Sequence, residues 1–215
     1  MPAIEITEKR KAGTGMVVYR VLDEVFRSWS HVAVLRALID SKTGFTGNET
    51  ARISGMHPRS ALKALTELEE LGIVNRQRGG RDHLFTLNRE HYLVVNVIIP
   101  LYEKENMFRG EIIKAITSIL KNKVISAVIF GSVARKEEEP LSDLDLCCIV
   151  NSAKEKNTVS ELINSKTAML NRMFGIKLAT VIFTVKEFKS KIKTQLMKEI
   201  IQQGLVVTGK NPGIL

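Results

Sequence analysis

The sequence predicts an α+β protein with two domains, and three features of the chain lead to that prediction. The first half contains three helical segments with an apolar face, followed by a hairpin-like pair of strands. The second half alternates apolar strand-like runs with helical segments, which predicts a small mixed sheet covered by helices. A helical stretch separates the halves. We therefore expect a first domain over residues 1–89, a helical linker over 90–108 and a second domain over 109–215.

The elements of the first domain are marked by their ends. Residues 16–26 suit a strand or a short helix, and Ser28 or Ser30 can cap a helix that runs to residue 39. Two further helices are expected over residues 47–54 and 58–71, because each is followed by a glycine. Leu62, Leu65, Leu68 and Leu71 form the apolar stripe of the last one.

A hairpin over residues 73–87 follows, with Gly79 and Gly80 at its tip. Trp29, the only tryptophan, is expected to pack into the core of this domain.

The connecting stretch, residues 90–121, is expected to be helical and interrupted at Pro100. Residues 92–101 present more apolar surface than a single linker helix needs to bury. That run either packs across the domains or forms the seam of a homodimer.

The second domain is expected to contain four strands and two further helices. The strands cover residues 124–130, 144–150, 181–184 and 205–207, and the helices cover 159–173 and 188–203. Asp143 and Asp145 stand at alternate positions where the second strand begins, so their side chains are expected to project together. Two carboxylates so placed repel each other unless a cation lies between them, and Mg²⁺ prefers such hard oxygen ligands. Gly131 and Ser132 form a turn that offers backbone N–H groups to a phosphate.

Gly131-Ser132, Ala134-Arg135 and the run Ser142-Asp143-Leu144-Asp145-Leu146 resemble the signature of the polymerase-beta-like nucleotidyltransferases, closest to the small, minimal branch. The resemblance implies that Asp143 and Asp145 are the catalytic, metal-binding pair. It also implies that Mg²⁺ and ATP or another NTP bind at Gly131, Ser132, Arg135 and Ser142. Lys136 stands where the small branch commonly has glycine.

The family's third carboxylate is missing from the expected strand. Ala179 or Thr180 occupies that position, and Glu187 is better explained as an acid at a helix start. Binding of a nucleotide is therefore a safer expectation than its transfer.

Residues 30–87 resemble a winged helix-turn-helix domain, on the evidence of the three helices, the basic hairpin and the ending Leu71-Gly72-Ile73-Val74. The resemblance implies a double-stranded DNA partner. Arg59, Ser60 and Lys63 would reach the major groove, and Arg76, Arg78 and Arg81 would place the wing against the backbone or minor groove. Winged helices also serve as protein-docking or dimerisation modules, and Glu67, Glu69 and Glu70 make part of the last helix acidic.

The composition agrees with a soluble, cytoplasmic protein. No apolar run approaches the ~18 residues of a membrane helix, and the start of the chain lacks the apolar stretch of a signal peptide. Cys147 and Cys148 are expected to be reduced, with one of them facing the core, and the four histidines are given no catalytic role. Residues 109–215 hold 17 basic and 10 acidic residues and so +7 of the net charge of +9, which suits a nucleotide or nucleic acid partner.

Two main hypotheses follow. The first is a DNA-binding protein that binds Mg-NTP and transfers a nucleotidyl group to a hydroxyl of a macromolecule. The alternative is a transcription regulator whose transferase-like domain is an inactive ligand sensor or scaffold. A third option is an antitoxin-like partner of a toxin protein, because small nucleotidyltransferases resemble members of such pairs.

Overall fold

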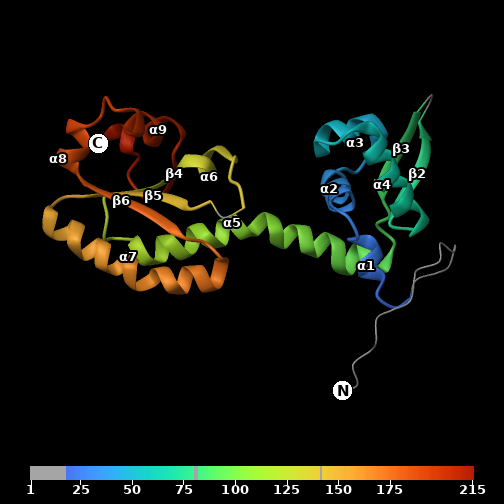
Figure 1. The fold of residues 1–215 in the computed structure, drawn as a ribbon, viewed down its shortest axis with the longest axis horizontal. Coiled ribbons are helices and arrows are strands. Elements are labelled where there is room, and N and C mark those ends of the chain that lie inside the picture. Colours follow the sequence, from blue (N-terminus) through green and yellow to red (C-terminus); the bar gives the residue numbers. More distant parts are fainter. Residues whose placement is uncertain (1–17, 80–81, 141) are drawn as a thin grey trace, which may run out of the picture. The chain divides into compact units, whose positions relative to one another are not determined.

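The structure is a computed structural model that describes residues 18–79, 82–140 and 142–215 (Figure 1). The chain divides into two compact units, residues 1–105 and 106–215. Residues 90–105, assigned to a linker from the sequence, group with the first unit. The reason is that Val94, Ile98 and Tyr102 are buried in its core.

The first unit contains the expected helices and hairpin in the expected order. Its elements are α1 (Val21–Val25), α2 (Trp29–Leu38), β1 (Phe45–Thr46), α3 (Gly47–Ser54), α4 (Pro58–Glu70), β2 (Val74–Gly79) and β3 (Asp82–Leu87). They form an antiparallel sheet in the order β1-β3-β2, of which the two-residue β1 has no sequence signal of its own. Gly79 pairs with Asp82, and Gly80, the other residue expected at the hairpin tip, lies outside the described residues.

Side-chain caps explain where these helices begin. Ser28 accepts a hydrogen bond from the His31 N–H at the start of α2. Thr46 and Glu49 form a reciprocal capping box at α3, and the His57 ring accepts from the Arg59 N–H at α4. The predicted helix starts are therefore confirmed within one or two residues.

Two side chains of the first unit do not lie where the sequence predicts. Trp29 is 65% exposed, because it occupies the first turn of α2 before the buried face begins. Leu62 is 46% exposed, since the buried face of α4 consists of Ala61, Ala64, Leu65 and Leu68.

The helix after β3 passes Pro100 without a break. A π-helical turn, η1 (Val94–Ile98), leads directly into α5 (Ile99–Leu120). Because proline has no N–H to donate to the preceding turn, a wider turn before Pro100 accommodates it. The predicted interruption is thus a local change of helix type.

The second unit is built on a mixed sheet of four strands. Its strands are β4 (Ser126–Phe130), β5 (Leu144–Val150), β6 (Leu178–Thr184) and β7 (Leu205–Gly209), in the order β6-β5-β4-β7. Strands β5 and β6 are parallel, and the other neighbours are antiparallel. Its helices, besides the end of α5, are α6 (Gly131–Arg135), α7 (Ala153–Phe174), α8 (Val185–Ser190) and α9 (Gln195–Gln203), followed by the 3₁₀ turn η2 (Pro212–Ile214).

Helices cover both faces of this sheet (Figure 1). Ile116 of α5 and Ile163 of α7 pack with Cys148 on one face, whereas Phe188 of α8 and Ile200 of α9 pack with Cys147 on the other. Both cysteines are free and buried, because both faces of the strand meet a core. The expectation that only one of them faces the core is therefore wrong.

One predicted helix is two. The segment expected as a single helix over residues 188–203 is split into α8 and α9 at residues 191–194. Thr184 and Glu187 form a capping box at the start of α8, and Thr194 caps α9. Along the described chain, no helix has both the length and the apolar character that crossing a membrane requires.

Candidate metal and nucleotide site

The site is centred on the contact between Gly131 and Asp145. Asp145 on β5 pairs with Phe130, the last residue of β4, and Gly131 follows immediately. A Cβ added to Gly131 would lie 2.1 Å from the Asp145 Oδ2 atom, and Gly131 has a φ of +72°. Glycine is needed here for both reasons. The acid of β5 and the turn after β4 are therefore brought together, as the sequence predicts.

Asp143 lies just outside the strand, one residue before β5, and is exposed. The pKa of Asp145 is raised by its burial, by Asp143 and by Glu199, and is lowered by Arg135. The pair therefore consists of one partly buried and one exposed carboxylate that repel each other.

Mg²⁺ is commonly held by one or two carboxylates together with water and substrate phosphates, so this donor set fits a Mg²⁺–nucleotide complex. Among the residues that the structure describes, no group of three or more His, Cys, Asp and Glu side chains is arranged to hold a metal ion by itself.

The strand register identifies the residue beside Asp145. Asp145 pairs with Ala179 of β6, whereas Thr180 pairs with Leu146 and so faces the opposite side of the sheet. The sequence leaves Ala179 and Thr180 as alternatives for the place where a third carboxylate is expected. The register assigns that place to Ala179. Glu187 instead caps α8 through Thr184 and contacts Lys156 at 3.2 Å.

Arg135, the predicted partner of the triphosphate, is already paired with two acids. Its Nε donates to Glu137 at 2.8 Å, and its Nη1 donates to Glu199 of α9. Both partners raise the pKa of the guanidinium, with the Glu137 hydrogen bond as the largest cause. Glu199 has no sequence signal as a site residue, because it reaches the site only through the packing of α9.

The other predicted nucleotide-binding residues have local roles. Ser132 lies in the first turn of the five-residue α6, and its carbonyl accepts from the Glu137 N–H. The Ser142 hydroxyl accepts from the Glu139 N–H at 3.0 Å and closes the turn before Asp143. Ser142 therefore shapes the approach to the acids in this structure.

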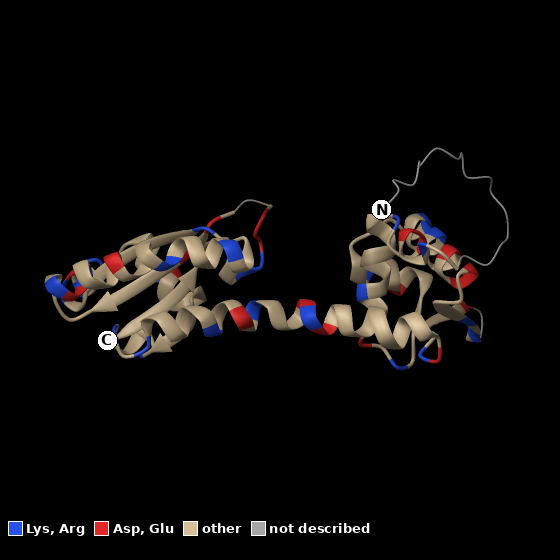
Figure 2. Cartoon of the chain, turned by 90° about the horizontal axis from the view of Figure 1, so that it is seen from below, with Lys and Arg blue, Asp and Glu red and all other residues tan. Residues whose placement is uncertain are grey.

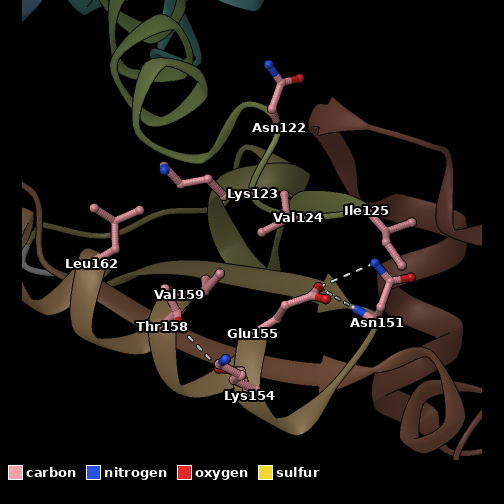
Figure 3. Close-up of a pocket in the computed structure, with 10 residues that line it drawn as sticks. All are labelled: Asn122, Lys123, Val124, Ile125, Asn151, Lys154, Glu155, Thr158, Val159 and Leu162. Atoms are coloured by element: carbon pink, nitrogen blue, oxygen red, sulfur yellow. Dashed lines mark hydrogen bonds between the residues drawn. The ribbon is translucent and has the colours of Figure 1, made fainter.

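A cleft of about 500 Å³ lies at the other end of the sheet. It is lined by residues 122–125, which precede β4, and by residues after β5, among them Asn151 and Glu155 (Figure 3). The Glu155 carboxylate accepts from the backbone and side-chain N–H groups of Asn151. Because Asp145 stands near the start of β5, this cleft is separate from the candidate metal site.

The candidate DNA-contacting residues of the first unit differ in how free they are. Arg59, Ser60 and Lys63 are exposed on the first turns of α4. On β2, Arg76 and Arg78 are both exposed, but Arg76 also lies over the Phe85 ring at 5.6 Å and 3.7 Å from Glu69. Arg81 lies outside the described residues. Figure 2 shows basic and acidic residues interspersed in this unit.

The comparison with curated proteins finds no match to the chain. The comparison with family models finds one for the second unit. Residues 114–213, which include both aspartates, Gly131 and Arg135, match the family described as polymerase beta, nucleotidyltransferase. At the level of the family, this match confirms the nucleotidyltransferase resemblance of the part of the chain that carries the site.

Proposed function

We propose that the second unit binds a magnesium–nucleoside triphosphate at Asp143 and Asp145 and transfers its nucleotidyl group to a hydroxyl of a macromolecule. The observation that carries this proposal is the close approach of Asp145 to Gly131, which joins the acidic pair to the turn that would receive the phosphates. Bound Mg²⁺ would neutralise the two carboxylates and the phosphate oxygens. Gly131 and Ser132 would contact the phosphates, and Arg135 would balance their charge.

Asp145→Asn tests the binding step. The amide keeps the size of the side chain but removes its charge, so the variant should lose Mg-ATP binding measured by calorimetry. Asp82→Asn is a matched control, because Asp82 is exposed on β3 of the first unit. Equal Mg-ATP affinity in wild type and Asp145→Asn would refute the proposal.

A second candidate function is favoured by Ala179. In a transfer reaction, the acceptor oxygen bonds to the α-phosphorus, the bond to pyrophosphate breaks, and the hydroxyl proton needs an acceptor. Because Ala179 supplies no base beside Asp145, a ligand-sensing regulator that binds nucleotide without turnover also agrees with the site. ATP labelled at the α-phosphate, incubated with the protein, Mg²⁺ and cell extract, separates the two. Label that becomes attached to RNA or protein indicates transfer. Saturable binding of ATP with no label attached to RNA or protein indicates sensing.

For the first unit, we propose a winged-helix module that binds double-stranded DNA. Its support is the order of helices and hairpin, the exposed Arg59 and Lys63 at the start of α4, and the exposed Arg78 on the hairpin. The opposing observation is the acidic second half of α4, so a protein-docking role is the alternative outcome. Binding of a random duplex, measured by fluorescence anisotropy against salt, distinguishes the two.

A further inference from the structure

Helix α9 is held firmly against the site by its own packing. The Thr194 side chain caps its first turn, and Met197 and Ile200 are fully buried against the sheet, with Val128 in the same core. Glu199 lies between these buried positions and is placed toward α6, where its side chain is 24% exposed. Its position is therefore determined by the helix and is not that of a freely moving surface acid.

Glu199 and Glu137 hold the Arg135 guanidinium from two directions. The bond to Glu137 uses Nε, and the bond to Glu199 uses Nη1. The planar guanidinium has five N–H groups in a fixed arrangement, so two carboxylates restrict its orientation strongly. Its side chain is 36% exposed, which leaves part of it open to a ligand.

Glu199 differs from Glu137 in its origin. Glu137 lies two residues after Arg135, whereas Glu199 comes from a separate helix that packs against the sheet. Helix α6 connects Glu199 to the acidic pair, because its first residue, Gly131, contacts Asp145 and its last, Arg135, donates to Glu199. A triphosphate that enters beside Asp145 competes with Glu199 for Arg135, because both are anions that need the same N–H donors.

We propose that Glu199 is a positioning residue that holds Arg135 beside the aspartate pair in the free protein and releases it to the triphosphate when a nucleotide binds. This inference rests on the proposed nucleotide site. Nucleotide binding then replaces the ion pair between Arg135 and Glu199 with one between Arg135 and the triphosphate. The affinity for Mg-ATP is therefore lower than Arg135 alone would provide.

A double-mutant cycle tests the exchange. We expect Glu199→Gln to tighten Mg-ATP binding about three- to fivefold, the range of a partly exposed ion pair. Arg135→Gln should weaken it about tenfold. In the Arg135→Gln background, Glu199→Gln should change the affinity less than about twofold, because the partner it competes for is absent. Glu161→Gln, an exposed position on α7, makes the same charge change on the other face of the sheet and should leave the affinity unchanged.

Two results would overturn the proposal. The first is a gain from Glu199→Gln that persists in the Arg135→Gln background, since Glu199 would then act by general repulsion. The second is an Arg135 Nη–H resonance, identified by its loss in Arg135→Gln, that is the same in wild type and Glu199→Gln, because Nη1 is the atom that donates to Glu199. This NMR readout needs no nucleotide. If wild type fails to bind Mg-ATP, the proposed function and the release step are refuted, whereas the resonance still shows whether Glu199 holds Arg135 in the free protein.

Discussion

Single residues decide whether the acidic pair and the phosphate turn can meet, and Gly131 is the clearest of them. Gly131→Ala adds a Cβ that would lie 2.1 Å from the Asp145 carboxylate at a φ of +72°. We expect the variant to push Asp145 away and to weaken Mg-ATP binding about tenfold or more, measured by calorimetry.

Gly175→Ala controls for the backbone strain alone, because Gly175 has a φ of +70° with no atom within 4 Å of an added Cβ. We expect it to lower the free energy of unfolding by about 1 kcal/mol and to leave Mg-ATP binding intact. Equal effects of the two variants on binding would show that the contact with Asp145 has no part in the site.

Tyr102 gives the first unit a defined response to alkaline pH. Its hydroxyl donates to the Val32 carbonyl at 2.7 Å, and burial raises its pKa to about 12. Because the folded state favours the neutral phenol, this stabilisation is complete below pH ~10, the ordinary value, and is lost as pH rises toward 12.

Urea unfolding at pH 8 and pH 11 measures this response. Between these two values, wild type should lose about 1 kcal/mol more stability than Tyr102→Phe. Tyr92→Phe, at a position that is 74% exposed, should follow wild type. The assignment to Tyr102 fails if the pH dependence of Tyr102→Phe is that of wild type.

At the scale of elements, β6 contains two threonines whose hydroxyls have opposite consequences. The Thr180 Oγ1 atom is buried and has no hydrogen-bond partner among the described residues, whereas the Thr184 hydroxyl caps α8. Thr180→Val should therefore raise the free energy of unfolding by about 1 kcal/mol, and Thr184→Val should lower it by about the same amount. Thermal unfolding of both variants checks the opposite signs, and a lower melting temperature for Thr180→Val would contradict this reading of the strand.

Elements with local signals were predictable from the sequence, and those that depend on distant contacts were not. Pro58 and Gly72 bracket α4, and the apolar runs around Asp145 mark β4 and β5, because these signals act within a few residues. The division between α8 and α9 has no glycine or proline to announce it. Trp29 was misplaced, since the face of a first helical turn depends on what packs beside it.

The residues of the candidate site also fall into two groups: those that local sequence signals identify, and those that only distant contacts bring to the site. Gly131 and the two aspartates lie in one strand-turn-strand unit, so their spacing alone brings them together. Glu199 comes from a helix more than fifty residues later, and only the packing of Met197 and Ile200 turns it toward Arg135. The choice between Ala179 and Thr180 needed the register of β5 and β6.

For the whole molecule, the net charge of +9 raises the question whether DNA would contact a defined surface or respond only to the total charge of the chain. Arg78 is exposed on β2, whereas Arg76 on the same strand already contacts Glu69 and the Phe85 ring. If the hairpin contacts phosphate, Arg78→Gln should weaken duplex binding more than Arg76→Gln. It should also reduce the salt dependence of log K by about one unit of slope.

Arg172→Gln makes the matched comparison, because Arg172 is exposed on α7 of the second unit and its loss changes the net charge equally. Fluorescence anisotropy with a random duplex between about 50 and 200 mM salt measures all three variants. A local interface predicts that Arg172→Gln binds as wild type does, since a charge outside the interface releases no counterions. Equal losses for Arg78→Gln and Arg172→Gln would mean that the duplex responds to the total charge of the chain and that the hairpin is not its contact surface.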